Sequence, residues 1–155
     1  MFFSFFSSKG LPTIGNLIAN NQRILIGYAY KFDVRQLPDS FIFWPPVQHL
    51  WANTDKMAEL ESYMDEQICK PSKSYHNIHL LRSIMAELTP TVEGVLFNRY
   101  HGLREMAATV NMHYEQWFRY RWPNCTNIVA GDFFLGSDLI DIANDVNRQR
   151  FQSSK

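Results

Sequence analysis

Apolar residues recur along the chain in two patterns, one with helical spacing and one of short continuous runs. A helix is predicted over residues 11–20, with an apolar face of Leu11, Ile14, Leu17 and Ile18. A compact run at residues 23–30 (RILIGYAY) has the length of a buried strand. The Pro45–Pro46 pair then interrupts residues 41–51, so a second short strand is expected at 47–51.

The middle of the chain continues this alternation. Asn53 or Thr54 is expected to cap a helix that ends near Lys70, with Met57, Leu60, Met64 and Ile68 on its apolar face. Residues 80–88 (LLRSIMAEL) form the next strand candidate. Residues 91–122 favour helix, with interruptions expected at Gly94 and Gly102. The firmer helix begins near Glu105 and carries an apolar stripe of Met106, Val110, Tyr114, Trp117 and Phe118.

The last elements are a strand over residues 126–134 and a helix capped by Ser137. Leu139, Ile142, Ala143 and Val146 are expected to face inward from that helix. Strands that alternate with crossover helices indicate an α/β fold with about four parallel strands. No glycine-rich phosphate loop follows any of these strands.

Composition narrows the class of protein. The chain has 155 residues, which suits one domain, and 46% of them are hydrophobic, which excludes an extended disordered tail. Lys plus Arg and Asp plus Glu each number 15, so net charge gives no attraction to nucleic acid. No apolar stretch is long enough to span a bilayer, and residues 1–10 (MFFSFFSSKG) lack the charge and cleavage pattern of a signal peptide.

Cysteine, asparagine and histidine positions suggest little further chemistry. Cys69 and Cys125 are too few for a disulfide framework and are expected to be free thiols. Asn124-Cys125-Thr126 matches the N-glycosylation pattern, but it adjoins a strand expected to be buried and nothing indicates secretion. His76, His79 and His101 have no completing ligand set, so no metal site is expected.

Four motifs occur in the order and spacing of one known domain. They are FWPPVQHLWANT (43–54), MAELTPT (85–91), GLRE (102–105) and TNIVAGDFFLGSDLI (126–140). Together they resemble the C-terminal half of the phosphatidylinositol-specific phospholipase C (PI-PLC) X domain, in the version found in small X-domain-containing proteins. The resemblance covers roughly residues 11–147, nearly the whole chain. It implies an irregular TIM-type barrel of which this chain carries strands five to eight, with the active site at the carboxyl ends of the strands.

The resemblance also implies a reaction, the cleavage of a phosphodiester by acid–base catalysis. One histidine takes the proton of the inositol 2-hydroxyl, whose oxygen attacks phosphorus, and a second protonates the leaving glycerol oxygen. Both histidines belong to the first half of the domain, in Gly-Ser-His-Asp-Ser-like and Ala-His-Gly-like settings that this sequence lacks. The chain alone is therefore expected to be inactive, and no cofactor is implied beyond the Ca²⁺ of larger relatives.

Three candidate site residues follow. In the family an aspartate at the position of Asp132 orients the base histidine, whereas the residues alone favour a turn or helix-capping aspartate. Trp51 could border an inositol ring or pack in the core, and Tyr28 ends the first strand near the same mouth. Glu87 and Thr89 end the 80–88 strand, where a solvated strand end is the simpler interpretation. Trp44 is expected to pack in the core or a loop.

The predicted organisation is an N-terminal extension or truncation scar at residues 1–10, a partial PI-PLC X-like domain at 11–150 and a tail at 151–155. The expected partner is a phosphoinositide or related phosphodiester, with a cytoplasmic or peripheral membrane location. The alternative is a non-catalytic half-barrel that acts as an interaction module. Open edges on the outer strands would favour self-association in either case.

Overall fold

The predicted parallel sheet is present in the computed structural model. Strands β3 (Gln48–Leu50), β6 (Arg82–Met85) and β7 (Ile128–Ala130) pair in that order, and all run parallel. The structure describes residues 13–24, 26–27, 43–44, 47–70, 74–75, 78–79 and 81–153, which fall into two units, Met1–Val47 and Gln48–Lys155. The sheet belongs to the second unit, whose fold is therefore α/β, as expected.

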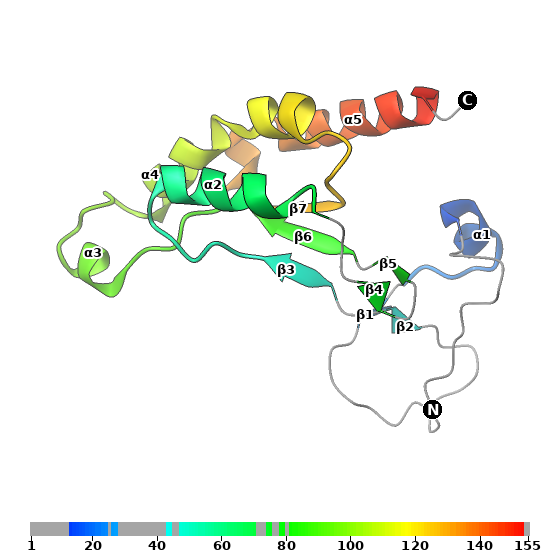
Figure 1. Cartoon of the computed structure of the whole chain (residues 1–155), viewed down its shortest axis with the longest axis horizontal. Helices are drawn as coiled ribbons and strands as arrows, with labels where there is room; N and C mark the ends of the chain where they lie inside the picture. Colours follow the sequence, from blue (N-terminus) through cyan, green and yellow to red (C-terminus); the bar gives the residue numbers. More distant parts are fainter. Residues whose placement is uncertain are drawn as a thin grey trace, which may run out of the picture. The chain divides into compact units, whose positions relative to one another are not determined.

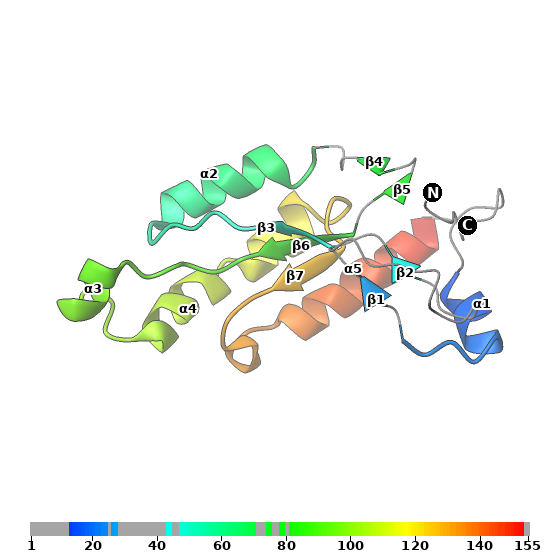
Figure 2. The same cartoon turned by 90° about the horizontal axis from the view of Figure 1, so that it is seen from below.

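The long helices of the second unit lie on one side of this sheet (Figures 1 and 2). They are α2 (Met57–Gln67), α4 (Leu103–Asn111), the π-helix η2 (Glu115–Arg121) and α5 (Leu139–Ser153). Leu50 of β3, Ile84 of β6 and Ala86 directly after β6 belong to a hydrophobic core, in which these side chains meet the apolar faces of the helices. Trp117 and Leu60 are completely buried there.

The apolar stripes predicted for two helices are confirmed. Leu60, Met64 and Ile68 of the α2 segment are buried, and so are all five stripe residues between Met106 and Phe118. In the last helix, Ile142 and Val146 are buried, but Ala143 is exposed. The expectation for Ala143 was wrong because the side of α5 that carries it faces away from the core.

Two predicted caps were wrong. α2 begins only at Met57, because the Thr54 hydroxyl accepts the Lys56 N–H (3.2 Å) and donates to the Glu59 carboxylate (2.6 Å), which holds 53–56 in a turn. The Ser137 hydroxyl donates to the Phe134 carbonyl (2.8 Å), closing the 3₁₀ turn η3 (Phe134–Gly136) instead of capping α5.

The 91–122 segment divides near one of the two predicted glycines. Gly94 lies inside helix α3 (Val92–Leu96). The break comes after this helix, at His101 and Gly102, which have positive φ angles of 54° and 108°. Gly94 is needed for another reason: a Cβ there would lie 2.2 Å from the Tyr100 ring. Gly102 thus ends the turn, and α4 starts directly after it.

At the amino edge of the sheet, Arg82 and a disulfide join three elements. The buried guanidinium of Arg82 donates to the carbonyls of Gln67, Ile68 (2.9 Å) and Lys70 (2.6 Å), and so satisfies the C-terminal end of α2. Cys69, directly after α2, is bonded to Cys125, three residues before β7, with 5.0 Å between their Cα atoms. The expectation of free thiols was wrong, because residues 56 positions apart are brought together only by the folded sheet.

The first unit holds a short helix and a pair of strands. α1 (Ile14–Ala19) begins where the Thr13 hydroxyl accepts the Asn16 N–H (3.2 Å), and Asn20 is its C-terminal cap, which agrees with the predicted end. β1 (Ile26–Gly27) pairs in parallel with β2 (Phe43–Trp44). The placement of the 23–30 strand beside β3 stays a prediction.

Two further strands, β4 (Ser74–Tyr75) and β5 (Ile78–His79), form a small antiparallel pair that the sequence did not predict. None of the helices in the described part of the chain combines the length and apolar character needed to cross a bilayer.

Candidate functional site

The carboxyl ends of three parallel strands bring the predicted site residues to one edge of the sheet. Trp51 directly follows β3, Glu87 lies two residues after β6, and Asp132 lies two residues after β7. Because β6 pairs with both β3 and β7, side chains from all three strand ends gather there. In barrel enzymes built from parallel strands this edge carries the chemistry, whereas the opposite edge serves stability.

Glu87 and Asp132 form the most polar part of this edge. Partial burial raises the pKa of the Glu87 carboxyl, and the nearby Asp132 carboxylate raises it further. Asp132 itself is exposed. A half-buried carboxyl with a raised pKa beside a second, exposed carboxyl can exchange protons and can orient a basic partner.

Tyr114 supports the two strand ends from the helix side. Its hydroxyl donates to the Ala86 carbonyl (2.9 Å). A Cβ on Gly131 would lie 1.9 Å from the Tyr114 hydroxyl oxygen. The missing side chain at Gly131 is therefore what lets Tyr114 reach β6. Burial and the two neighbouring carboxyls raise the pKa of the Tyr114 phenol, so it stays protonated and keeps donating.

The backbone beyond Asp132 is also fixed. The Asn111 side-chain amide donates to the carbonyls of Asp132 (3.2 Å) and Phe133 (3.3 Å), and Phe133 adopts a left-handed conformation with φ of 48°. These contacts hold the turn after β7 and leave the Asp132 carboxylate facing solvent, ready for a partner.

Trp51 joins the ends of β3 and β6. Its indole N–H donates to the Thr89 hydroxyl (2.8 Å), and the Thr89 N–H donates to the Thr54 carbonyl (2.8 Å). Trp51 is 49% exposed, so it is not a core residue.

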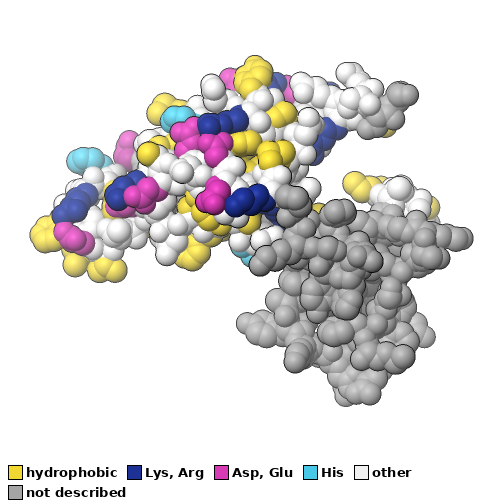
Figure 3. Space-filling view, in the orientation of Figure 1, with side chains coloured by type: hydrophobic (Ala, Val, Ile, Leu, Met, Phe, Trp, Pro, Cys, Tyr) yellow, Lys and Arg dark blue, Asp and Glu magenta, His cyan; other side chains and the backbone are white. Residues whose placement is uncertain are grey.

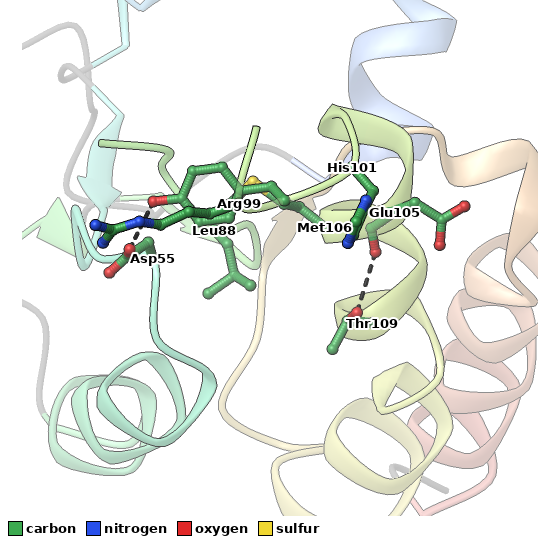
Figure 4. A pocket seen from close by; sticks show the side chains of 8 residues that line it. Asp55, Leu88, Arg99, His101, Glu105, Met106 and Thr109 are labelled. Atoms are coloured by element: carbon green, nitrogen blue, oxygen red, sulfur yellow. Dashed lines mark hydrogen bonds between the residues drawn. The ribbon is translucent and has the colours of Figure 1, made fainter. Parts of the chain in front are cut away.

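A pocket of about 330 Å³ opens beside this edge (Figure 4). Its lining comes from the loop after β3, the end of the β6 segment, the α3–α4 turn and α4, and comprises Asp55, Leu88, Arg99, Tyr100, His101, Glu105, Met106 and Thr109. The Tyr100 hydroxyl donates to the Asp55 carboxylate (2.6 Å) and is also in contact with the Thr91 hydroxyl (2.9 Å). This hydrogen bond holds Asp55 and Tyr100 together in the wall of the pocket.

The other predicted residues fall outside this arrangement. Tyr28 and the side chain of Trp44 lie outside the described residues, as do the side chains of His76 and His79. His101 lines the pocket, and among the described residues no group of three His, Cys, Asp or Glu side chains could hold a metal ion.

Sequence reasoning missed the pocket residues. Asp55 was expected in the first turn of a helix, Arg99 and Tyr100 in a helix-favouring segment between the interruptions at Gly94 and Gly102, and Glu105 at the start of the firmer helix. The signal that could have found them is the position of residues 52–55 directly after a predicted strand, where parallel-sheet sites form.

Comparison with known proteins finds a similarity to a human protein. PI-PLC X domain-containing protein 1 of Homo sapiens is 27% identical over 132 residues, covering 83% of this chain and 38% of the relative. The chain thus spans well under half of that protein's length. No family model matches the chain, and no solved structure matches it. The similarity is weak support for a relationship to PI-PLC X-domain proteins.

The coupling of the two carboxyls can be measured in this chain. In Asp132→Asn, the pKa of Glu87 should fall toward its ordinary value of 4.5, because one of the two causes of its elevation is removed. ¹³C NMR of the Glu87 side-chain carboxyl during a pH titration measures this. Asp138→Asn, in the same loop, should leave the Glu87 pKa unchanged, and an equal response to both substitutions would contradict the pairing.

The raised pKa of Glu87 also determines how this carboxyl changes the free energy of unfolding with pH. Protonated Glu87 favours the folded state, so its contribution is complete below the ordinary pKa of 4.5 and is lost as pH rises through the raised value.

Proposed function

We propose that the carboxyl edge of the β3–β6–β7 sheet is the second half of a phosphodiester-cleaving site of PI-PLC X type. Asp132 orients and stabilises a base histidine, and the substrate is a phosphoinositide or a related phosphodiester. The observation that carries the proposal is the Glu87–Asp132 pair at adjacent parallel strand ends, because Asp132 is the position that the family resemblance assigns to the orienting carboxylate.

The base and acid histidines come, in this proposal, from a part of the domain that the 155 residues do not contain. Two histidines of the described residues, His101 and His113, do not suit these roles. His113 is held against the Thr109 carbonyl (2.9 Å) and stacks on Trp117, and His101 lies in the pocket beside the edge. Asp132 would accept from one ring nitrogen of the base and leave the other free to take the inositol 2-hydroxyl proton.

The sheet supports a partial barrel of TIM type. Parallel sheets are normally covered on both faces, yet within the described part of the second unit the long helices lie on one side only. Among those residues β3 and β7 each pair with β6 alone. Both features fit strands six, seven and eight of a barrel. The uncovered face would line the barrel interior, and the outer edges of β3 and β7 would pair with neighbouring strands.

Trp51 and the adjacent pocket supply a place for the head group. An exposed indole face stacks on a sugar-like ring, and the pocket offers charged and hydroxyl side chains for ring hydroxyls. The volume of about 330 Å³ lies at the lower end of the range for small-molecule sites.

A segment swap tests the proposal. The segment of this chain that matches the human relative replaces the corresponding residues of that protein, and release of inositol phosphate from phosphatidylinositol vesicles is measured beside the unaltered relative. The swapped protein should release inositol phosphate, and the 155-residue chain alone should not. A folded swap without turnover, beside an active relative, would contradict the proposal.

That contrary result would favour the second candidate, an interaction module. Its support is the apolar surface of α3 and the residue after it, where Val92, Val95, Leu96 and Phe97 are all exposed (Figure 3). Such a surface on a monomer marks a site of association.

A further inference from the structure

The turn that precedes β7 combines a disulfide with an exposed asparagine. Asn124-Cys125-Thr126 is the only Asn-X-Ser/Thr sequence in the chain, and its middle residue is bonded to Cys69. Two reasons had argued against its modification, an expected burial beside a strand and the lack of any sign of secretion. Features of the structure bear against both reasons.

The first change concerns accessibility. The Cys125 N–H donates to the Trp122 carbonyl (3.1 Å), which closes a turn with Pro123 and Asn124 at its two central positions. Asn124 is exposed at this turn, and β7 begins only at Ile128. Arg150 of α5 donates to the carbonyls of Pro123 and Thr126 (3.1 Å), so the backbone on each side of Asn124 is held while its side chain faces solvent.

The second change concerns the compartment. The bond between Cys69 and Cys125 ties the end of α2 to the approach to β7, at the edge that also holds the buried Arg82. Disulfides of this kind persist in oxidising compartments such as the endoplasmic reticulum and are rare in the cytosol. N-glycosylation takes place in that same compartment and requires an Asn-X-Ser/Thr sequence on the surface.

We propose that this chain matures in the secretory pathway and carries an N-linked glycan on Asn124. The cytoplasmic location expected from the sequence is then replaced by a lumenal or extracellular one. Thr126 is buried in the folded protein. The sugar must therefore be attached before β7 packs, while the hydroxyl of Thr126 is still accessible.

The position of Asn124 leaves the candidate site open. It precedes β7, whereas Asp132 follows it, so the glycan and the polar edge lie at opposite ends of that strand. A glycan there would cover the disulfide and the α2 end without obstructing Trp51, Glu87 or Asp132. The modification is independent of the proposed reaction.

The test uses the protein made from its natural transcript in eukaryotic cells. The protein is alkylated before any reduction, treated with peptide N-glycosidase and analysed by gel mobility and peptide mass. The expected result is faster migration after treatment, conversion of Asn124 to Asp in the tryptic peptide, and no alkylation of Cys69 or Cys125. Asn124→Gln should abolish the mobility change, whereas Asn147→Gln, an exposed asparagine outside any such sequence, should retain it.

Unmodified Asn124 would overturn the proposal, whether or not the disulfide is present. Alkylation of both cysteines in the native protein would overturn the secretory assignment, because it would show a reducing compartment. Thr126→Ser keeps the acceptor sequence and should keep the glycan. A loss of the glycan in that variant at normal protein yield would count against Asn124 as well.

Discussion

Asp132→Asn in the segment swap should lower kcat for phosphatidylinositol cleavage by about 10²- to 10³-fold, with little change in KM. Asparagine keeps the shape of the side chain but removes the negative charge. In the proposed mechanism that charge stabilises an imidazolium that forms only as the base takes the 2-hydroxyl proton, so the loss should fall on turnover. In serine-protease triads the equivalent change costs about 10⁴-fold. A smaller effect is expected here because Asp132 is exposed and water screens its charge.

The fold should tolerate this substitution. The contacts that hold the turn are made by the Asp132 backbone carbonyl to Asn111, and these remain in the variant. Asp138→Asn is the matched control, since it removes one carboxylate from the same loop without touching the strand end, and its kcat should equal that of the parent. If Asp132→Asn stayed within about threefold of the parent, below a typical acid–base contribution, the orienting role would be untenable.

Removing the disulfide should cost about 4 kcal/mol of unfolding free energy. The bond closes a loop between residues 56 positions apart, and constraining a loop of that length in the unfolded chain gives a stabilisation of this size. The double variant Cys69→Ser, Cys125→Ser replaces one exposed and one half-buried side chain, so little packing is lost with the bond. Urea unfolding of the parent and of the variant, without reductant, measures the difference.

Reductant provides the control for this measurement. Dithiothreitol should lower the midpoint of the parent to that of the double variant and leave the variant unchanged. A difference below about 1 kcal/mol, or two titratable thiols in the native parent, would contradict a structural disulfide that ties α2 to β7.

The helices and the parallel sheet could be predicted because their signals are local. Helical spacing places Met106, Val110, Tyr114, Trp117 and Phe118 on one face, which is buried wherever the helix packs. The structure buries all five. The position of Trp51 and Asp132 after their strands could also be predicted. Because the strands are parallel, their carboxyl ends lie at the same edge of the sheet.

What could not be predicted depends on contacts between distant residues. Nothing near Arg82 in the sequence indicates that its guanidinium satisfies the end of α2, fourteen residues earlier at Ile68. The pairing of Cys69 with Cys125 and the approach of Tyr114 to Gly131 likewise exist only in the folded sheet. The pocket was missed for the same reason, because Asp55 and Tyr100 are 45 residues apart and meet across two loops.

The most direct test of the orienting role of Asp132 is the pH dependence of kcat/KM in the segment swap and in its Asp132→Asn variant. Activity should fall on the acid side as the base histidine becomes protonated. If Asp132 orients the base as proposed, its carboxylate raises the pKa of that histidine by stabilising the charged form, so the asparagine variant should lose activity only at a lower pH. A displaced acid limb together with the lowered kcat is the result that the account predicts. An acid limb at the same pH in both proteins would contradict it, because Asp132 would then have no charge interaction with the base.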